Sequence, residues 1–224
     1  MREIVLDTET TGLDPVGGHR IVEVAAIELF NHVQTGEYRH FYLNPERDMP
    51  EDAFRIHGLS IEFLSQHKSF ADECEEFLKF IDGAQLIIHN AEFDLKFLDH
   101  ELRRCGRPPI DRSRGVVDTV SMARRKFPGA PASLDALCRR FEIDLSARVR
   151  HGARLDCELL ALVYLELIGG REPGLDLAAS ARRRARQATA TAVIRPPRPH
   201  APSDAELAAH AEFLKKLKEP AWLN

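Results

Sequence analysis

The sequence contains no hydrophobic run close to the roughly 20 residues that a membrane-spanning helix needs, and it opens on a strand-like pattern without the apolar segment of a signal peptide. Cysteine is scarce. The four that occur are Cys74, Cys105, Cys138 and Cys157, and no two of them have the C-x-x-C spacing of a zinc site. We therefore expect no membrane partner, a cytoplasmic location, and reduced, mostly buried cysteines in place of a disulfide framework.

The chain also lacks the excess of positive charge that DNA-binding domains usually carry. Its 224 residues have a formal net charge of −4 at pH 7. Residues 171–200 contain seven arginines and two acids, whereas residues 1–170 contain 21 basic and 29 acidic residues. The first 170 residues therefore have no strong basic field with which to attract nucleic acid. If they act on DNA, they need to be delivered to it.

Hydrophobic patterns and turn signals predict a domain of mixed sheet and helices over residues 1–170. Strand-like runs cover 2–8, 20–30, 37–43, 84–88 and 115–118, and helical patterns cover 70–82, 91–105, 119–127, 133–141 and 152–168. The first three strands follow one another closely, which indicates an antiparallel meander. Asn90, Asp118 and Ser133 are the expected helix N-caps. We predict an α/β fold with a mixed five-stranded sheet flanked by helices.

The composition changes after residue 170. Residues 171–202 have few large apolar side chains and contain RRRAR at 182–186 and RPPRPHAP at 195–202, which predicts a flexible linker. Order is expected to resume at Ser203, where SDAE has the capping-box form with Glu206 three residues on. Residues 203–224 should form a short terminal helix. The apolar residues on one face of it are Leu207, Ala211, Leu214 and Leu217.

Acidic residues cluster at the ends of predicted elements. In IVLDTETTGLD, residues 4–14, Asp7 and Glu9 are two positions apart, so they point to the same face of a strand. Asp94 and Asp156 fall in the early turns of two predicted helices. Taken alone, the strand pair is a solvated strand end, and Asp94 is a first-turn acid favoured by the helix dipole.

If the strand end and the two helix starts converge, three or four acids surround one small volume, which is costly unless cations neutralise them. Hard oxygen ligands favour Mg²⁺ or Mn²⁺ over Zn²⁺. Two such ions held ~4 Å apart suit in-line attack on a phosphodiester. His151 stands five residues before Asp156. An imidazole with an ordinary pKa of ~6.5 can accept the proton of an attacking water near neutral pH.

Three motifs around these residues resemble those of the DEDDh 3′→5′ exonucleases, which have a ribonuclease H-like fold. They are DTETTG with Asp7 and Glu9, HNAEFD with Asp94, and HGARLD with His151 and Asp156. The order and separation of the motifs also fit, over residues 1–170. Within this group, IHGLSIEFL at 56–64 and FPGAPASLDALCRRFEI at 127–143 are most similar to the epsilon (proofreading) subunits of bacterial DNA polymerase III.

The resemblance implies that Asp7, Glu9, Asp94 and Asp156 bind two divalent cations, Mg²⁺ or Mn²⁺, and that His151 is the general base. It also implies a set of contacts with the terminal nucleotide of the substrate. That set is Thr10, Leu13, His57, Gly58 and Leu59. For His57 a structural explanation is almost as good, because a residue before a glycine often ends a helix.

These inferences predict a 3′→5′ DNA exonuclease that releases nucleoside monophosphates from a single-stranded or frayed DNA 3′ end, as the proofreading subunit of the DNA polymerase III holoenzyme. Tethering through the tail would raise its effective concentration at DNA. Two alternatives stay open. One is a DEDDh exonuclease that acts on RNA or short oligonucleotides, and the other is a mainly structural adaptor between polymerase and sliding clamp. The intact acids argue against the adaptor, since a scaffold has no need of uncompensated charges.

The start of the tail predicts a contact with the beta sliding clamp. EPGLDL at 172–177 resembles the clamp-binding motif Q-x-x-L-x-L, with Leu175 and Leu177 as the leucines that enter an apolar pocket. Glu172 replaces the usual glutamine and cannot donate an amide hydrogen bond, which suggests a weak contact. The alternative is an ordinary start of a linker.

The end of the tail predicts a contact with the DNA polymerase III alpha subunit. Residues 203–224 resemble the segment with which the family docks on its polymerase, and Trp222 is the only tryptophan of the chain. Tryptophan and leucine on a short tethered helix are typical interface anchors. The expected polymerase-binding residues are Leu207, Leu214, Leu217 and Trp222.

Overall fold

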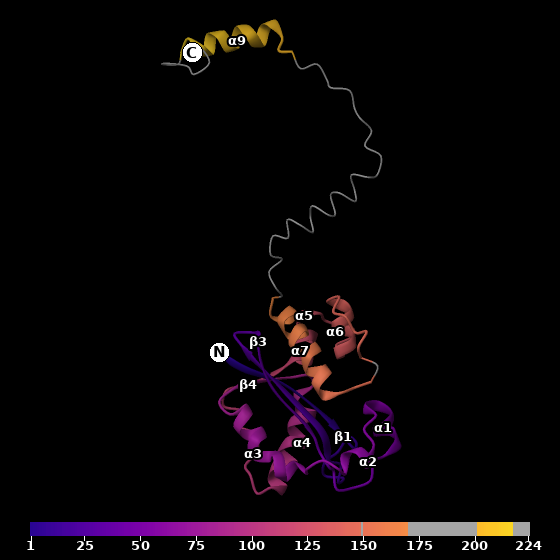
Figure 1. Cartoon of the computed structure of the whole chain (residues 1–224). Helices are drawn as coiled ribbons and strands as arrows, with labels where there is room; N and C mark the ends of the chain where they lie inside the picture. The colour runs from indigo at the N-terminus through magenta and orange to yellow at the C-terminus, as the bar shows by residue number, and fades with distance from the viewer. Residues whose placement is uncertain (149, 170–200, 217–224) are drawn as a thin grey trace. The chain divides into compact units, whose positions relative to one another are not determined.

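The computed structural model describes residues 1–148, 150–169 and 201–216 (Figure 1). The chain divides into two units, Met1–Gly174 and Leu175–Asn224, and each is described by itself. Within the described ranges, no helix combines the length and the apolar character that crossing a membrane requires.

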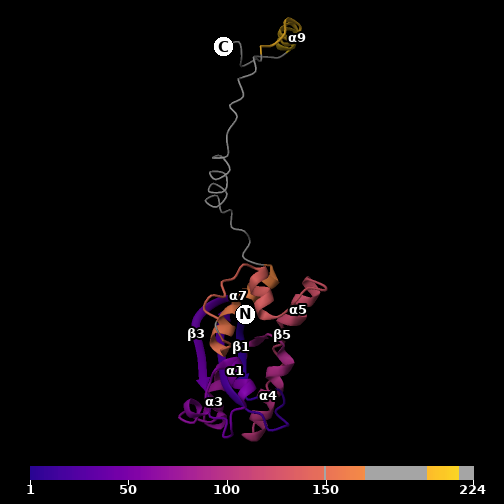
Figure 2. The same cartoon turned by 90° about the vertical axis from the view of Figure 1, so that its right-hand side faces the viewer.

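A mixed five-stranded sheet forms the centre of the first unit. Its strands are β1 (Arg2–Thr10), β2 (Ile21–Phe30), β3 (Val33–Tyr42), β4 (Gln85–Ile88) and β5 (Val116–Asp118). They lie in the order β3-β2-β1-β4-β5. In Figure 2, β3 is on the left, β1 in the middle and β5 on the right. β1, β2 and β3 pair antiparallel, whereas β4 pairs parallel with both β1 and β5. The predicted mixed sheet with an N-terminal meander is confirmed.

One face of the sheet is covered by α3 (Phe70–Ile81) and α4 (Ala91–Arg104). Their apolar side chains form one buried cluster with Ile4 and Leu6 of β1. Val5, which lies between these two residues, belongs to the cluster on the opposite face. This alternation is the period of two that a strand buried on both faces imposes.

The other face is covered by α5 (Thr119–Lys126), α6 (Leu134–Arg140) and α7 (Ala153–Ile168) (Figure 1). The apolar residues of α7 pack on β1 and β2. These five helices, α3 to α7, were predicted to within about a residue at each end. Four of them extend over at least two turns and show a 3.6-residue period, whereas α6, with seven residues, is indicated by its N-cap Ser133.

Two short helices, α1 (Glu51–His57) and α2 (Ile61–Leu64), were not predicted. They span seven and four residues, which is too short for a clear period. α1 ends where Gly58 adopts a left-handed conformation, with φ 75°, and its N–H donates to the carbonyl of Phe54. α1 bears on function because His57 is its last residue.

Asp118, the N-cap of α5, also fixes the turn between β4 and α4. The Asp118 side chain accepts from the N–H of Val120, as expected of an N-cap. Asn90 does occupy the N-cap position of α4, but it is left-handed, with φ 69°, and its side chain makes no capping hydrogen bond. The predicted N-cap position is therefore confirmed, although the Asn90 side chain does not cap the helix. Instead, the Asn90 N–H donates to Asp118 Oδ1 at 3.0 Å, which ties this turn to the end of β5.

In the second unit, α9 (Asp204–Leu214) begins with the predicted capping box. Ser203 Oγ accepts from the N–H of Glu206, whose carboxylate accepts from the N–H of Ser203. Leu207 is half-exposed and Leu214 is partly buried. Several residues of the predicted tail contacts lie outside the described residues, as does the predicted linker up to residue 200. These residues are Glu172, Leu175, Leu177, Leu217 and Trp222.

All four cysteines carry free thiols. Three of them, Cys74, Cys138 and Cys157, are buried, and Cys105 is partly buried. The prediction of reduced cysteines that act as small hydrophobic residues is confirmed.

Candidate active site

Asp7 and Glu9 lie inside β1, which extends two residues past its predicted end to Thr10. Both alternate in phase with Val5 and so face the layer that contains α7. The last pair between β1 and β4 joins Leu6 to Ile88, so β1 continues beyond its parallel neighbour. The two carboxylates therefore project at an edge that β4 leaves open.

Asp94 reaches this edge from the first turn of α4, which begins directly after β4. Its Oδ1 accepts two hydrogen bonds from Thr8, one from the backbone N–H at 3.1 Å and one from the hydroxyl at 2.7 Å. These bonds satisfy a backbone donor of β1 that has lost its strand neighbour. They also fix the Asp94 carboxylate beside β1.

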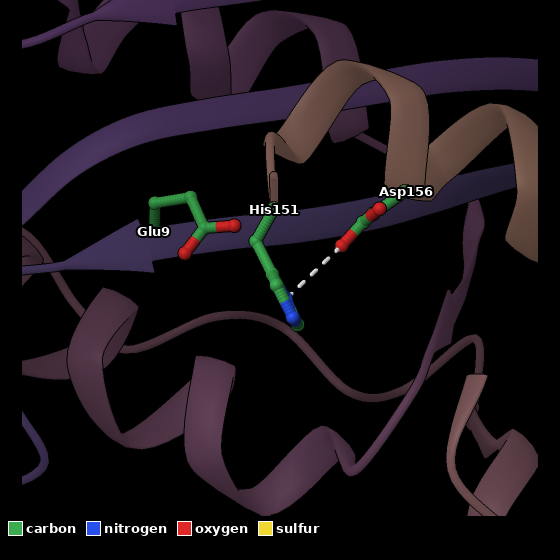
Figure 3. A group of neighbouring side chains, drawn as sticks. All are labelled: Glu9, His151 and Asp156. Atoms are coloured by element: carbon green, nitrogen blue, oxygen red, sulfur yellow. Dashed lines mark ion pairs between the residues drawn. The ribbon is translucent and has the colours of Figure 1, made fainter. Parts of the chain in front are cut away.

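Asp156 comes from the first turn of α7, and His151 from the loop just before that helix (Figure 3). The ligand atoms of Glu9, His151 and Asp156 all lie within 4.8 Å of one another. His151 Nδ1 lies 3.6 Å from Asp156 Oδ2. Glu9 and Asp156 are buried, whereas the His151 side chain is half-exposed. This group brings together two motifs that are far apart in the sequence, and Asp94 adds the third through its bonds to Thr8 of β1.

Glu23 of β2 supports this arrangement, and the sequence analysis did not identify it. α7 begins after Gly152, which has no side chain to cap it, and Glu23 Oε2 accepts from the N–H of Ala153 at 3.1 Å. Glu23 Oε1 lies 2.7 Å from Nε2 of His40, and Glu23 is paired with Glu9 across the sheet. A carboxylate at a helix N-terminus is stabilising. Glu23 therefore attaches the start of α7 to the strand opposite Glu9.

Burial and mutual repulsion raise the pKa values of the acids. Burial, together with the charges of Asp156 and Glu23, raises the pKa of Glu9 from its ordinary 4.5 to about 8. Burial raises the pKa of Asp94 to about 7. Burial, followed by the charges of Asp94 and Glu9, raises the pKa of Asp7 well above its ordinary value. A divalent cation that binds these oxygens would therefore have to displace protons from them.

The donor set fits a hard divalent cation, because it consists of carboxylate oxygens and one imidazole. The thiol of Cys157, beside Asp156 in α7, is not part of it. Cys157 Sγ donates to the carbonyl of Ala25 at 3.3 Å, and burial raises the pKa of the thiol. A thiol held in this way stays protonated and is no metal ligand.

Arg148 is a further residue that the sequence analysis missed. Its Nε and Nη2 each donate to one oxygen of Asp156, both at 2.6 Å, and its Nη1 donates to Asp135 of α6. The Arg148 side chain is 7% exposed, so the ion pair with Asp156 is desolvated. Because the guanidinium already neutralises this carboxylate, a cation that binds Asp156 competes with Arg148 for its charge.

Arg148 also contacts His151, with Nη2 3.0 Å from Nδ1. A guanidinium has only donors, so Nδ1 accepts here and the ring proton is on Nε2. A neutral imidazole has one lone pair for proton uptake. In this arrangement that lone pair is occupied by Arg148, and His151 becomes free to act as a base when the contact opens.

The residues expected to touch a terminal nucleotide fall into two groups. Thr10 and His57 are both buried, and the backbone of Thr10 partly offsets the lowering of the His57 pKa by burial. Leu59 donates its N–H to His57 Nδ1 at 3.0 Å, around the left-handed Gly58. His57 is thus both the residue before a glycine helix stop and a neighbour of Thr10.

Leu13 is different, because its side chain is 82% exposed. It lies on the turn after β1, where Gly12 is packed so closely that an added Cβ would lie 2.3 Å from the His19 ring. Asp14 pairs with Lys96 of α4 at 2.8 Å, which holds this turn in place. The turn therefore presents an apolar side chain to solvent from a fixed backbone.

Comparison with known proteins finds an exonuclease family profile and relatives that share one name. The sequence profile of the exonuclease family (RNase T type) matches residues 4–164. DNA polymerase III subunit epsilon of Rickettsia felis is 49% identical over 232 residues, which cover 99% of this chain and 99% of the relative. The protein of the same name from Escherichia coli K12 is 47% identical over 176 residues, which cover 76% of this chain and 72% of the relative.

Solved structures with the same architecture include the nuclease domain of 3′hExo, a DEDDh family member bound to rAMP. Its TM-score is 0.64 at 15% identity, with 75% of this chain and 91% of that chain covered. Exonuclease X in complex with 5′ overhanging duplex DNA gives a TM-score of 0.57 at 22% identity, with coverage of 74% and 90%. At such identities the likeness shows the fold alone. The predicted ribonuclease H-like exonuclease fold is confirmed.

The raised pKa of Glu9 predicts how stability depends on pH. In the presence of a chelator, the free energy of unfolding should fall as the pH rises from about 4.5 to about 8. In this window folded Glu9 keeps a proton that the unfolded chain releases, so the folded state loses stability with rising pH. Saturating Mg²⁺ should flatten the decline, because it stabilises the ionised carboxylates.

Urea unfolding at a series of pH values, with chelator and with Mg²⁺, measures this dependence. Glu9→Gln is the matched control, and its decline in chelator should be shallower than that of the wild type. A wild-type stability in chelator that stays constant across this window would contradict the prediction.

Arg148→Gln should weaken the folded protein in chelator by about 3 kcal/mol, because Asp156 is left buried without its cation. Added Mn²⁺ should recover most of this loss. The Mn²⁺ dissociation constant should be lower than in the wild type, since the competing guanidinium is gone. Thermal melting and calorimetric Mn²⁺ titration provide the two measurements.

Arg154→Gln is the matched control, because Arg154 lies on the first turn of α7, beside Asp156, but is 44% exposed and pairs with Glu158 at 3.3 Å. It should change neither stability nor Mn²⁺ affinity by much. Equal Mn²⁺ affinities for Arg148→Gln and the wild type would show that Arg148 and the cation do not compete.

Proposed function

The chain belongs to the exonuclease family and, within it, to the epsilon subunits of DNA polymerase III, and from this premise we propose that it is the 3′→5′ proofreading exonuclease of a replicative DNA polymerase. It is a phosphodiester hydrolase that releases nucleoside monophosphates from DNA. The observation that carries the proposal is the convergence of acids from β1, α4 and α7 with His151 at one edge of the sheet.

Each catalytic residue has a separate task at the scissile phosphodiester. Asp7, Glu9, Asp94 and Asp156 would hold two divalent cations, Mg²⁺ or Mn²⁺, and these would supply Lewis acidity for phosphodiester hydrolysis. His151 accepts the proton of the attacking water once its contact with Arg148 opens. Its half-exposed ring, on a loop before α7, has room to turn.

The terminal nucleotide rests against the end of β1 and the end of α1. Thr10 and His57 are buried neighbours that line one side of this position, with Gly58 and Leu59 forming the turn. Leu13 supplies an exposed apolar side chain from the turn after β1, suited to packing against a base.

Selectivity for errors follows from the cost of separating the terminal nucleotide from its partner, which is lowest at a mismatched end. The acidic catalytic domain, residues 1–170, binds DNA weakly by itself. Residues 171–202 form a linker, and residues 203–224 dock on the DNA polymerase III alpha subunit. Tethering of this kind raises the effective concentration of the nuclease at the primer end.

Residues 172–177 make a weak contact with the beta sliding clamp in this proposal. Leu175 and Leu177 are the anchors, and Glu172 weakens the contact because a carboxylate cannot replace the donor of an amide. Such a contact would restrain the tether without fixing it.

Asp7→Ala combined with Glu9→Ala should lower Mg²⁺-dependent release of nucleotides from a 3′-mismatched DNA primer by at least ~100-fold. Loss of an outer-shell partner alone costs 10- to ~100-fold, and these residues are proposed as direct ligands. The double variant should stay folded in chelator, because it removes two repelling carboxylates. Retained nuclease activity would refute the assignment of the site.

The same assay separates the proposal from its alternatives. Wild-type protein should degrade the mismatched DNA primer faster than an RNA oligomer of matched sequence, and a preference for RNA would favour the ribonuclease alternative. Absence of activity on both, with polymerase binding intact, would favour the adaptor.

Deletion of residues 203–224 should abolish co-elution with the polymerase alpha subunit in size-exclusion chromatography, because it removes the proposed docking helix. Cleavage of free single-stranded oligonucleotides should stay within about twofold of the wild type, since the catalytic residues are untouched. Lys215→Ala with Lys216→Ala is the matched control and should preserve co-elution. Unchanged co-elution of the deleted form would contradict the docking role.

A further inference from the structure

Two cavities of the first unit adjoin one another at the acid cluster. The first is lined by Asp7, His89, Ser133, Leu134, Asp135, Arg148, His151 and Asp156. The second is lined by His89, Asn90, Val120, Arg124, Ala130, Pro131, Ala132 and Ser133. His89 and Ser133 belong to both, so the two cavities form one groove. We call it the α5 groove, and it leads from the acids to Arg124 on the last turn of α5.

The charge of the α5 groove changes along its length. Its first cavity contains three carboxylates, whereas no carboxylate lines the second. The second cavity has one permanent positive charge, the Arg124 guanidinium. A polyanion avoids carboxylates and is attracted to such a position.

Arg124 is available to a ligand. It is exposed, and it forms no ion pair or hydrogen bond with any residue of the described ranges. Lys126, two residues later in α5, differs in this respect. Lys126 Nζ donates to the carbonyls of Glu166 and Leu167 at 2.8 and 2.9 Å, and so is engaged within the fold.

Four of the eight residues that line the second cavity have small apolar side chains. Ala130, Pro131 and Ala132 come from the loop between α5 and α6, and Val120 from the first turn of α5. Sugars and bases pack on such surfaces without needing a specific partner, whereas a phosphate needs a donor or a cation. One guanidinium beside uncharged walls matches this pattern.

The α5 groove and the position proposed for the terminal nucleotide are formed by different residues. None of the residues proposed to hold the terminal nucleotide, from Thr10 to Leu59, lines either cavity of the α5 groove. The terminal nucleotide and the α5 groove are therefore served by different residues around the acids, and the groove leads away toward Arg124. A strand that is cut at the acids must leave in a direction other than the pocket of its last nucleotide.

We propose that the α5 groove holds the single DNA strand on the 5′ side of the scissile phosphate, and that Arg124 binds one of its phosphates. This inference rests on the proposed function. Arg124 is a binding residue for the longer substrate and takes no part in bond cleavage. A substrate without upstream nucleotides makes no use of it.

Comparison of two substrates tests the proposal. A seven-nucleotide single-stranded oligodeoxynucleotide needs the groove, whereas the p-nitrophenyl ester of thymidine 5′-monophosphate occupies only the acids and the terminal pocket. Arg124→Glu should raise the KM for the oligonucleotide by about 10-fold and leave kcat unchanged. The kcat/KM for the ester should stay within about twofold of the wild type. The slope of log KM against log salt should fall by about one, as for a lost phosphate contact.

Arg125→Glu is the matched control, because Arg125 is the next residue of α5, is also exposed, and does not line the groove. It should raise the KM for the oligonucleotide much less. Ala130→Glu is a second, independent variant that places a carboxylate in the groove wall, and it should reproduce the KM effect of Arg124→Glu. Circular dichroism and thermal melting verify that each variant is folded.

Several outcomes would overturn the inference. Equal effects of Arg124→Glu and Arg125→Glu would show a general charge effect, and loss of ester hydrolysis would show that Arg124 acts elsewhere. Wild-type values for both Arg124→Glu and Ala130→Glu would show that the strand takes another path. If the wild-type protein cleaves neither substrate, the proposed function itself fails, and this result is distinguishable from the others.

Discussion

The repulsion among buried carboxylates at the open edge of β1 is the constraint on which the rest of this structure depends. A fold that concentrates Asp7, Glu9, Asp94 and Asp156 in one place must hold them against their charge. It does so with neutral and cationic partners, since Thr8 fixes Asp94 and Arg148 fixes Asp156. The sheet helps by its topology, because β4 stops at Ile88 while β1 continues to Thr10.

The layers of the fold can be predicted from the sequence, because each layer is built from elements with a local hydrophobic pattern. Alternation in β1 places Ile4 and Leu6 in one layer and Val5 in the other, and the same period already places Asp7 beside Glu9. Prediction from the sequence was incomplete where a helix is too short to show a pattern, and where the backbone of a residue makes the contact in place of its side chain. α1 and α2 are too short to show a period, and Asn90 acts through its left-handed backbone and not through its side chain.

The residues that support the site could not be predicted from the sequence, for a different reason. Glu23 acts on Ala153, 130 positions later in the chain, and Arg148 acts across a loop with no periodicity. The one signal in the sequence is that Glu23 lies within the apolar run IVEVAAIELF, where a charged residue needs a partner. The proposed ligands can be predicted from the sequence because their chemistry is recognisable in short motifs, whereas the residues that support them are defined only by the tertiary structure that brings them close.

A nuclease of this design faces a conflict, because the carboxylates that bind cations also repel the phosphates of the substrate. Divalent cations settle the conflict only within the reach of the acids. Further along the strand the protein itself must avoid negative charge, and the α5 groove, without a carboxylate at its outer end, meets that need. One arginine gives little affinity, and little is required if a tether supplies the encounter. Weak binding also lets a correctly paired end leave before it frays. Thus the acidity of residues 1–170, the sparse charge of the groove and the long tail are consistent parts of one solution.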